Sequence, residues 1–263
     1  MFKNILKGLT SYKDSLKLIN QLKLWKYFLV PMGISFLFGI AVFFTVYGLS
    51  DNLGRFFAKA WIWEWGQETV TEIATWLGAL VILVLGFILY KHVVMALSAP
   101  FMSPVSERVE KHFYPNARNH IQHRDTTNTE QLWRGIRINL RNIAYELLIT
   151  LPLLLLSFIP VIGIVFTITA FMVQAYYAGF GNMDYTLERH FKYRDSVNFV
   201  KRNRGIAIGI GIVFMGMLFI PLLGVILVLP FTVTAASRAT LEEMIKEENL
   251  SLPDAQKPQI NAS

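Results

Sequence analysis

Residues 147–183 read LLITLPLLLLSFIPVIGIVFTITAFMVQAYYAGFGNM and contain no charged side chain. A second uncharged stretch, residues 205–237, reads GIAIGIGIVFMGMLFIPLLGVILVLPFTVTAAS. A helix crosses the core of a bilayer with about 20 residues, so each stretch is too long for one straight crossing. Each also contains a Pro-x-x-Gly break, at Pro160–Gly163 and at Pro221–Gly224. Because Pro ends a helix and Gly permits a tight reversal, we predict that each stretch folds as a helical hairpin.

The two predicted hairpins, residues 143–183 and 205–238, are expected to insert only partly into the membrane. Basic side chains flank both ends of each hairpin, which places these ends on the cytoplasmic side by the positive-inside rule. The uncharged arms 147–159 and 225–237 have 13 residues each. Such an arm is about 20 Å long, which is short for a hydrocarbon core of about 30 Å. The alternative is four complete crossings with very tight outer turns.

Two further uncharged runs predict ordinary transmembrane helices. Residues 27–50 include 24 residues without a charge, and residues 73–90 include 18. The second helix is expected to extend over 73–100, with Lys91 either reaching towards the interface or facing protein. The fold class is therefore an all-α integral membrane protein with a single membrane domain. The remaining parts are a cytoplasmic segment, residues 101–142, and a polar tail, residues 239–263.

The composition agrees with a membrane protein and excludes several other classes. Hydrophobic residues make up 54% of the chain and charged residues 16%, whereas about 25% charged residues is usual in globular proteins. The net charge of +7 is concentrated beside the apolar runs, as in residues 1–26, which carry +5. This distribution predicts contact with lipid and no nucleic-acid partner. The absence of Cys excludes disulfides and thiolate metal sites.

The first 26 residues predict an amphipathic helix that lies on the membrane surface, rather than a cleaved signal peptide. The alternative is a solvated helix that packs on the protein. We expect both termini in the cytoplasm and the acidic loop with Trp61, Trp63 and Trp65 on the other side of the membrane. The apolar face of the helix consists of Phe2, Ile5, Leu6, Leu9, Tyr12, Leu16 and Ile19.

Enzyme motifs are absent from the sequence, and we expect no cofactor. Gly205, Gly209 and Gly216 lie in an apolar stretch without the strand–turn–helix context of a nucleotide loop, so they are expected to permit close helix packing. His112, His120 and His123 share one segment that reads as a loop. We interpret them as solvated histidines, with a metal site as the alternative.

Polar residues at the membrane boundary are the better candidates for function. Lys26 lies where the amphipathic segment joins the first transmembrane helix, and no Asp or Glu lies inside the four uncharged runs. Broken helices place N-terminal backbone N–H groups inside the membrane, where they attract anions. This pattern favours a path for a small oxyanion over a path for a cation.

Several motifs resemble those of the CysZ sulfate-permease family, which belongs to the etoposide-induced membrane-protein superfamily. The motifs follow the family's order along nearly the whole chain. Where the family typically carries two adjacent arginines, this chain has Trp25 and Lys26. The matching segments are LWKYFLVP at 24–31, APF at 99–101, SERVE at 106–110, LWRGIR at 132–137, MDY at 183–185, ERH at 188–190 and KRNRG at 201–205.

The resemblance implies an oligomeric protein of the bacterial inner membrane that takes up sulfate for cysteine synthesis. The leading hypothesis is therefore a channel or permease for sulfate or a similar oxyanion. A non-transporting scaffold that remodels lipid or holds partner proteins is the rival, and a membrane enzyme comes third. The candidate anion-binding residues are Lys26, Trp25, Tyr27 and Arg189, and the candidate pore or vestibule residues are Glu107, Glu110 and Asp184.

Overall fold

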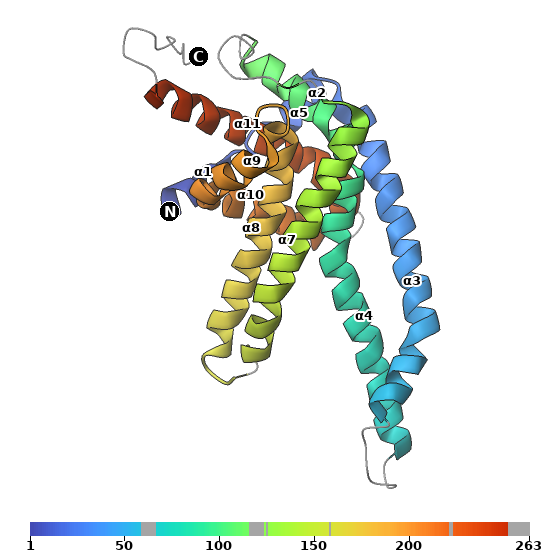
Figure 1. Ribbon diagram of the computed structural model, residues 1–263. Coiled ribbons are helices and arrows are strands. Elements are labelled where there is room, and N and C mark those ends of the chain that lie inside the picture. The colour runs from blue at the N-terminus through green and yellow to red at the C-terminus, as the bar shows by residue number, and fades with distance from the viewer. Residues whose placement is uncertain (59–66, 116–123, 125, 158, 221–222, 252–263) are drawn as a thin grey trace.

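A computed structural model describes the chain except for residues 59–66, 116–123, 125, 158, 221–222 and 252–263 (Figure 1). In the described part, every regular element is a helix. The predicted tryptophan-rich loop, as well as His120 and His123, lies outside the described residues. The helices are α1 (Phe2–Thr10), α2 (Ser15–Gln21), the 3-10 helix η1 (Leu24–Phe28), α3 (Leu29–Ala58), α4 (Gln67–Leu97), α5 (Ala99–Phe113), α7 (Asn128–Leu156), α8 (Gly163–Leu187), α9 (Tyr193–Arg202), α10 (Arg204–Leu218) and α11 (Leu223–Ser251).

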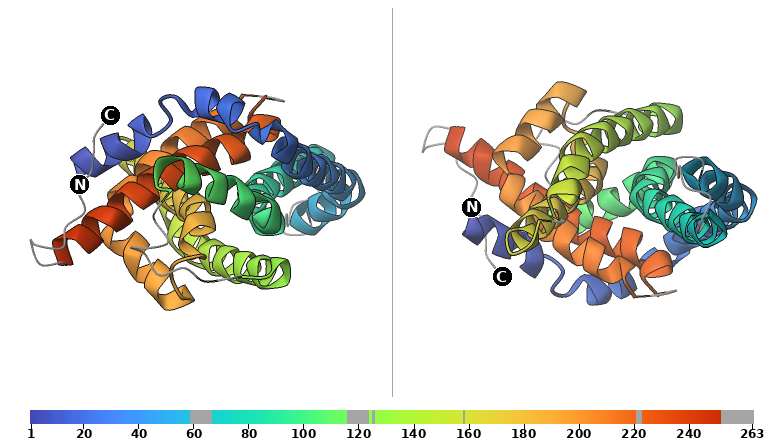
Figure 2. Two further views of the ribbon diagram at one scale, coloured as in Figure 1. Left: turned by 90° about the horizontal axis from the view of Figure 1, so that it is seen from above. Right: turned by 90° about the horizontal axis from the view of Figure 1, so that it is seen from below.

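Two long helical hairpins, α3–α4 and α7–α8, dominate the architecture. They lie close together at the upper end of the view and diverge towards their tips, and the α3–α4 tip extends farthest (Figure 1). Seen along this direction, the two hairpins form separate pairs of helices (Figure 2). The short helices α1, α2, α5 and α9 gather at the end opposite the tips. Among the described residues, three stretches are long and apolar enough to cross a membrane, namely Leu24–Leu49, Asn128–Leu156 and Gly163–Leu187.

The reversal predicted at Pro160 and Gly163 is confirmed. Helix α7 ends at Leu156 and α8 begins at Gly163. Between them, Val161 has a φ of 71°, a left-handed conformation that is strained for a β-branched residue. A Cβ on Gly163 would overlap the backbone carbonyl of Ser157, so the tight turn requires Gly at this position.

The arms of this first hairpin are longer than the uncharged run indicated. Helices α7 and α8 have 29 and 25 residues, or about 43 Å and 37 Å. The prediction that these arms are too short to cross is therefore wrong, because polar residues extend α7 well before residue 147. The depth to which the hairpin inserts stays a prediction, since both helices are long enough for a complete crossing.

The second hairpin is built differently. Helix α10 has 15 residues, or about 22 Å, which is short for a complete crossing. The chain reverses between Leu218 and Leu223, which is the region where the sequence places Pro221. Helix α11 then continues through the predicted polar tail to Ser251. By its length, α10 is compatible with partial insertion.

The N-terminal segment is not the single amphipathic helix that the sequence predicted. Positive φ angles at Asp14 (67°) and Lys23 (52°) divide it into α1, α2 and η1. Helix α1 packs directly on α10, because a Cβ on Gly8 would overlap the carbonyl of Ile206 and a Cβ on Gly209 that of Ile5. The predicted packing role is thus confirmed for Gly205 and Gly209, whereas Gly216 has no neighbour within 4 Å.

The membrane helix predicted over 73–100 ends earlier, at Leu97. The chain then bends by 70° into α5, because Pro100 has no N–H with which to continue the α4 hydrogen bonds. Lys91 faces protein, as one of the two predicted alternatives stated, and is 1% exposed. The predicted cytoplasmic segment 101–142 consists largely of α5 and the first half of α7.

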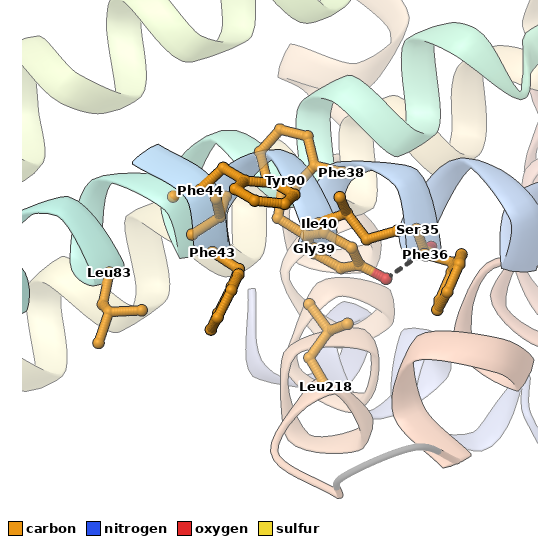
Figure 3. A pocket seen from close by; sticks show the side chains of 12 residues that line it. Ser35, Phe36, Phe38, Gly39, Ile40, Phe43, Phe44, Leu83, Tyr90 and Leu218 are labelled. Atoms are coloured by element: carbon orange, nitrogen blue, oxygen red, sulfur yellow. Dashed lines mark hydrogen bonds between the residues drawn. The ribbon is translucent and has the colours of Figure 1, made fainter. Parts of the chain in front are cut away.

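A large apolar hollow of about 710 Å³ lies between the α3–α4 hairpin and Leu218 at the end of α10 (Figure 3). Phe36, Phe43 and Leu218 line it, and its polar contact is the hydrogen bond from the Tyr90 hydroxyl to Ser35 Oγ, 2.9 Å long. The hollow offers nothing that would compensate a charged solute for the loss of water. A path for ions has to be sought elsewhere, among the buried polar residues.

Candidate functional site

The C-terminal end of α8 carries buried ion pairs that include three of the sequence-predicted residues. Arg189 donates from Nη2 to Glu110 Oε2 at 2.7 Å and to Ser106 Oγ at 2.9 Å. His190 Nε2 lies 3.2 Å from the same oxygen of Glu110. The structure therefore brings Arg189 and Glu110 together, and Ser106 was missed. The predicted vestibule role of Arg189 requires a conformation in which this pair opens, because its side chain is 5% exposed here.

Asp184 belongs to a second ion pair of this region. Arg134 of α7 binds it through two hydrogen bonds, Nε to Oδ2 at 3.1 Å and Nη2 to Oδ1 at 2.8 Å. The same guanidinium donates to Ser196 Oγ at 2.6 Å and to the carbonyl of Phe191 at 2.7 Å. A bidentate pair of this kind holds α7, α8 and the start of α9 in a fixed arrangement.

Glu188 lies between these two pairs, just beyond the end of α8. It is buried, and burial raises the pKa of its carboxyl to about 7, although a hydrogen bond with Ser103 opposes the rise. The negative charge of Asp184 raises the pKa further, and Arg189 and Arg134 lower it. Among the acids at this end of the bundle, Glu188 is thus one that takes up a proton near neutral pH.

The predicted residues Trp25, Lys26 and Tyr27 lie on η1 at the surface, apart from Arg189. The Lys26 ammonium is 5.1 Å from the centre of the Tyr27 ring, and the Arg108 guanidinium of α5 is 5.6 Å from the same ring. Arg108 is anchored by a hydrogen bond to the carbonyl of Leu22 at 3.1 Å. We call Lys26, Tyr27 and Arg108 the Tyr27 cation cluster.

Trp25 and Glu107 have other contacts. The Trp25 indole donates to Asn20 Oδ1 at 2.6 Å, and its ring lies 4.9 Å from that of Phe28. Glu107 forms an ion pair with Lys111 on α5, and the distance from Lys111 Nζ to Glu107 Oε1 is 2.7 Å. The η1 helix starts after Lys23 without a side-chain cap.

A buried polar stripe runs along α7, and the sequence reasoning did not predict it. Its members recur every three or four residues, the period of one helix face. Glu146 is central: its Oε1 accepts from Lys91 Nζ at 2.6 Å, and its Oε2 lies 2.8 Å from His92 Nε2. All three side chains are 0% exposed. The polar side chains of the stripe are Gln131, Asn139, Asn142, Glu146 and Thr150, and Gly135 lies on the same buried face.

This stripe corrects one step of the sequence argument. Glu146 directly precedes the uncharged run that starts at residue 147, so the run itself contained no carboxylate. Because α7 begins at Asn128, Glu146 is in fact inside a membrane-length helix and pairs with α4. The three- and four-residue spacing of polar side chains was the sequence signal that could have revealed it.

The fold and these contacts define the class of the protein: a helical integral membrane protein with ion pairs buried between its long helices. Within the described residues, no group of three or more His, Asp or Glu side chains is placed to hold a metal ion.

Comparison with protein families then places the chain more closely. The family described as sulfate transporter CysZ/etoposide-induced protein 2.4 matches residues 11–229. The chain therefore belongs to this family, as the motifs predicted. A search of curated proteins finds no match for the chain.

Proposed function

We propose that this chain is a channel or permease for sulfate or a related small oxyanion. The observation that carries the proposal is the family match over residues 11–229, whose description names a sulfate transporter. The Tyr27 cation cluster supports it, since Lys26 and Arg108 present two cations at one aromatic ring. Oxyanions are bound in proteins by such cations through charge-assisted hydrogen bonds.

Arg108 supplies the second cation that the sequence lacks at position 25. The family's paired arginines are replaced here by Trp25 and Lys26, and Lys offers a point charge rather than a bidentate fork. Arg108 comes from α5 and reaches the same ring as Lys26. In the proposal, Lys26 and Arg108 bind the oxyanion together, and Trp25 and Tyr27 shape the mouth of the path.

The inner part of the proposed path lies at the cytoplasmic end of α8. Opening of the Arg189–Glu110 pair would expose a cation, while Glu107 and Asp184 would border the vestibule. We place both termini in the cytoplasm of a bacterium, and the ion pair between Lys7 and Glu243, 2.9 Å long, holds α1 beside α11 in agreement with this. Exposed apolar side chains on both hairpins suit lipid and further copies of the chain. The proposed role is sulfate uptake for cysteine synthesis.

Uptake of radiolabelled sulfate into proteoliposomes tests the proposal. We expect Lys26→Ala to raise the half-saturating sulfate concentration about tenfold, the effect of one lost charge-assisted hydrogen bond. Arg108→Ala should act in the same direction, and Trp25→Arg should lower the half-saturating concentration. Lys201→Ala is the matched control, because Lys201 is an exposed lysine on α9.

The outcomes separate the site from the function. Unchanged uptake in both Lys26→Ala and Arg108→Ala would remove the Tyr27 cation cluster from the path and leave transport in place. No uptake of sulfate, phosphate or chloride by correctly folded protein would contradict transport itself. The scaffold hypothesis would then be the better account of the fold.

A further inference from the structure

His92 has an oxygen acceptor at each of its two ring nitrogens. Its Nε2 lies 2.8 Å from Glu146 Oε2, and its Nδ1 lies 3.3 Å from Asn139 Oδ1. A neutral imidazole carries one N–H and one lone pair, so it can satisfy only one of two acceptors. The imidazolium carries two N–H groups and satisfies both. The surroundings of His92 are therefore complementary to its doubly protonated form.

The orientation of Asn139 is fixed by the backbone. Its Nδ2 donates to the carbonyl of Gly135 at 2.9 Å, and a carbonyl can only accept. Turning the amide over would set two oxygens against each other at Gly135 and lose this hydrogen bond. Asn139 thus presents its oxygen to His92, and the second acceptor belongs to the site.

The charged groups that act on His92 are Lys91 on α4 and Glu146 on α7. On α4, Lys91 lies beside it and pairs with Glu146, while its Nζ also lies 3.9 Å from the sulfur of Met215 on α10. With Lys91 and Glu146 ionised, the Lys91–His92–Glu146 triad has no net charge when His92 is neutral and +1 when it is protonated. A buried charge of +1 attracts an oxyanion strongly because little water screens it.

Polar atoms on α7 continue the site in both directions. Asn142 and Thr150 lie one helical turn to either side of Glu146, and both are buried. Asn142 Nδ2 and Thr150 Oγ1 have no hydrogen-bond partner among the described residues. Asn142 Oδ1 accepts from Arg141 Nη1 at 3.0 Å, and Arg141 is half-buried. Because amide and guanidinium groups do not release protons themselves, water bound by these polar groups would carry a proton between solvent and the triad.

We propose that His92 is a proton-binding site within the membrane, and that its protonation favours oxyanion passage along the α4–α7 interface. The proposal rests on the transport function inferred above. A proton from the aqueous phase adds to the free ring nitrogen of His92, giving the imidazolium bound to Glu146 and Asn139. The same nitrogen later releases the proton to water, which restores the neutral imidazole. Sulfate uptake should therefore increase as the pH on the entry side falls.

The proton site itself can be tested without transport. Protein labelled with isotopic histidine is reconstituted into phosphatidylcholine–phosphatidylglycerol liposomes and titrated by solid-state NMR from about pH 8 to about pH 5. The His92 signals are assigned by their loss in His92→Gln. We expect them to change from neutral imidazole to imidazolium within this range. In Asn139→Leu, which removes one acceptor, the midpoint should move about one unit to lower pH.

The coupling is tested by sulfate uptake at the same pH values. Wild-type uptake should rise towards low pH, whereas His92→Gln should show uptake that no longer depends on pH. Gln retains a donor for Glu146 but does not titrate. The control is His112→Gln, since His112 is exposed on α5 and contacts the Phe113 ring edge to face. This variant should keep the wild-type pH dependence.

Each outcome decides a different point. His92 signals that stay in one protonation state throughout would overturn the proton site. Titration of His92 combined with unchanged pH dependence in His92→Gln would overturn the coupling while sulfate transport stands. Titration of His92 without sulfate uptake at any pH would support the proton site and overturn the proposed transport function.

Discussion

The two long hairpins have similar lengths and opposite characters. In α3–α4, large apolar side chains such as Phe43 and Phe44 are 66% and 65% exposed. A neutral hydrogen bond between Tyr90 and Ser35 links α4 to α3. In α7–α8, by contrast, a polar stripe and two sets of ion pairs face the neighbouring helices. One hairpin thus presents its surface to lipid, while the other directs its polar groups inward.

This difference shows which hairpin carries groups that lower the stability of the fold. Buried charges cost free energy unless each is paired and hydrogen-bonded, and a protein can replace them with apolar residues at no loss of stability. An apolar hairpin such as α3–α4 is sufficient to anchor the fold in a membrane. The charges in α7–α8 and in the facing part of α4 are therefore best understood as serving function. Variants in both hairpins test how sharp this division is.

The largest effect is expected from Glu146→Leu. The change leaves Lys91 charged, buried and without its carboxylate, which should destabilise the protein by about 3–5 kcal/mol. Thermal unfolding in detergent, followed by the loss of monodisperse protein, measures the effect. In the double variant Lys91→Met with Glu146→Leu, most of the loss should be recovered because no buried charge is left alone.

Tyr90→Phe provides the counterpart in the apolar hairpin. It removes one neutral hydrogen bond to Ser35, which is worth about 1 kcal/mol. If Tyr90→Phe destabilised the protein as much as Glu146→Leu, the contrast between the two hairpins would be lost.

Much of the fold follows from the sequence because long uncharged runs and Pro–Gly breaks have few structural solutions. The all-helical class, the reversal between Leu156 and Gly163 and the close packing at Gly209 were predictable in this way. The division of the N-terminal segment was not, since it depends on positive φ angles at Asp14 and Lys23, which these residue types permit but do not require. The length of α7 was underestimated because charges were taken as helix limits.

The candidate site was predictable only in part, for a related reason. The sequence identifies charged residues near the membrane, but it does not tell which helices bring them together. Arg189 and Glu110 are 79 positions apart in the chain, and Arg108 meets Tyr27 only because the chain bends by 70° between α4 and α5. Glu146 could have been recognised from the polar spacing along α7. Its pairing with Lys91 and His92 required the tertiary structure.

A further prediction concerns how the stability of the polar hairpin α7–α8 depends on pH. Glu188 has a pKa of about 7 in the folded protein, raised by burial from an ordinary value of 4.5. The folded state therefore holds a proton that the unfolded state releases between these values, so stability should fall as the pH rises from about 4.5 to about 7. The total contribution is at most about 3 kcal/mol. Melting temperatures measured across this range should decrease less steeply in Glu188→Gln. An identical slope in wild type and variant would assign the pH dependence to other groups.

The last comparison uses two glycines, one in each long hairpin. A Cβ on Gly179 of α8 would overlap the carbonyl of Ala207, where α8 and α10 meet, whereas a Cβ on Gly48 of α3 meets nothing within 4 Å. Gly179→Ala should therefore destabilise the protein by about 1–3 kcal/mol through forced separation of the two helices. Gly48→Ala should leave stability unchanged or raise it by up to about 1 kcal/mol, since Ala favours the helix. Equal melting temperatures for the two variants would mean that α8 and α10 are not held in close contact. That result would contradict the rigid packing on which the buried polar contacts of α7–α8 depend.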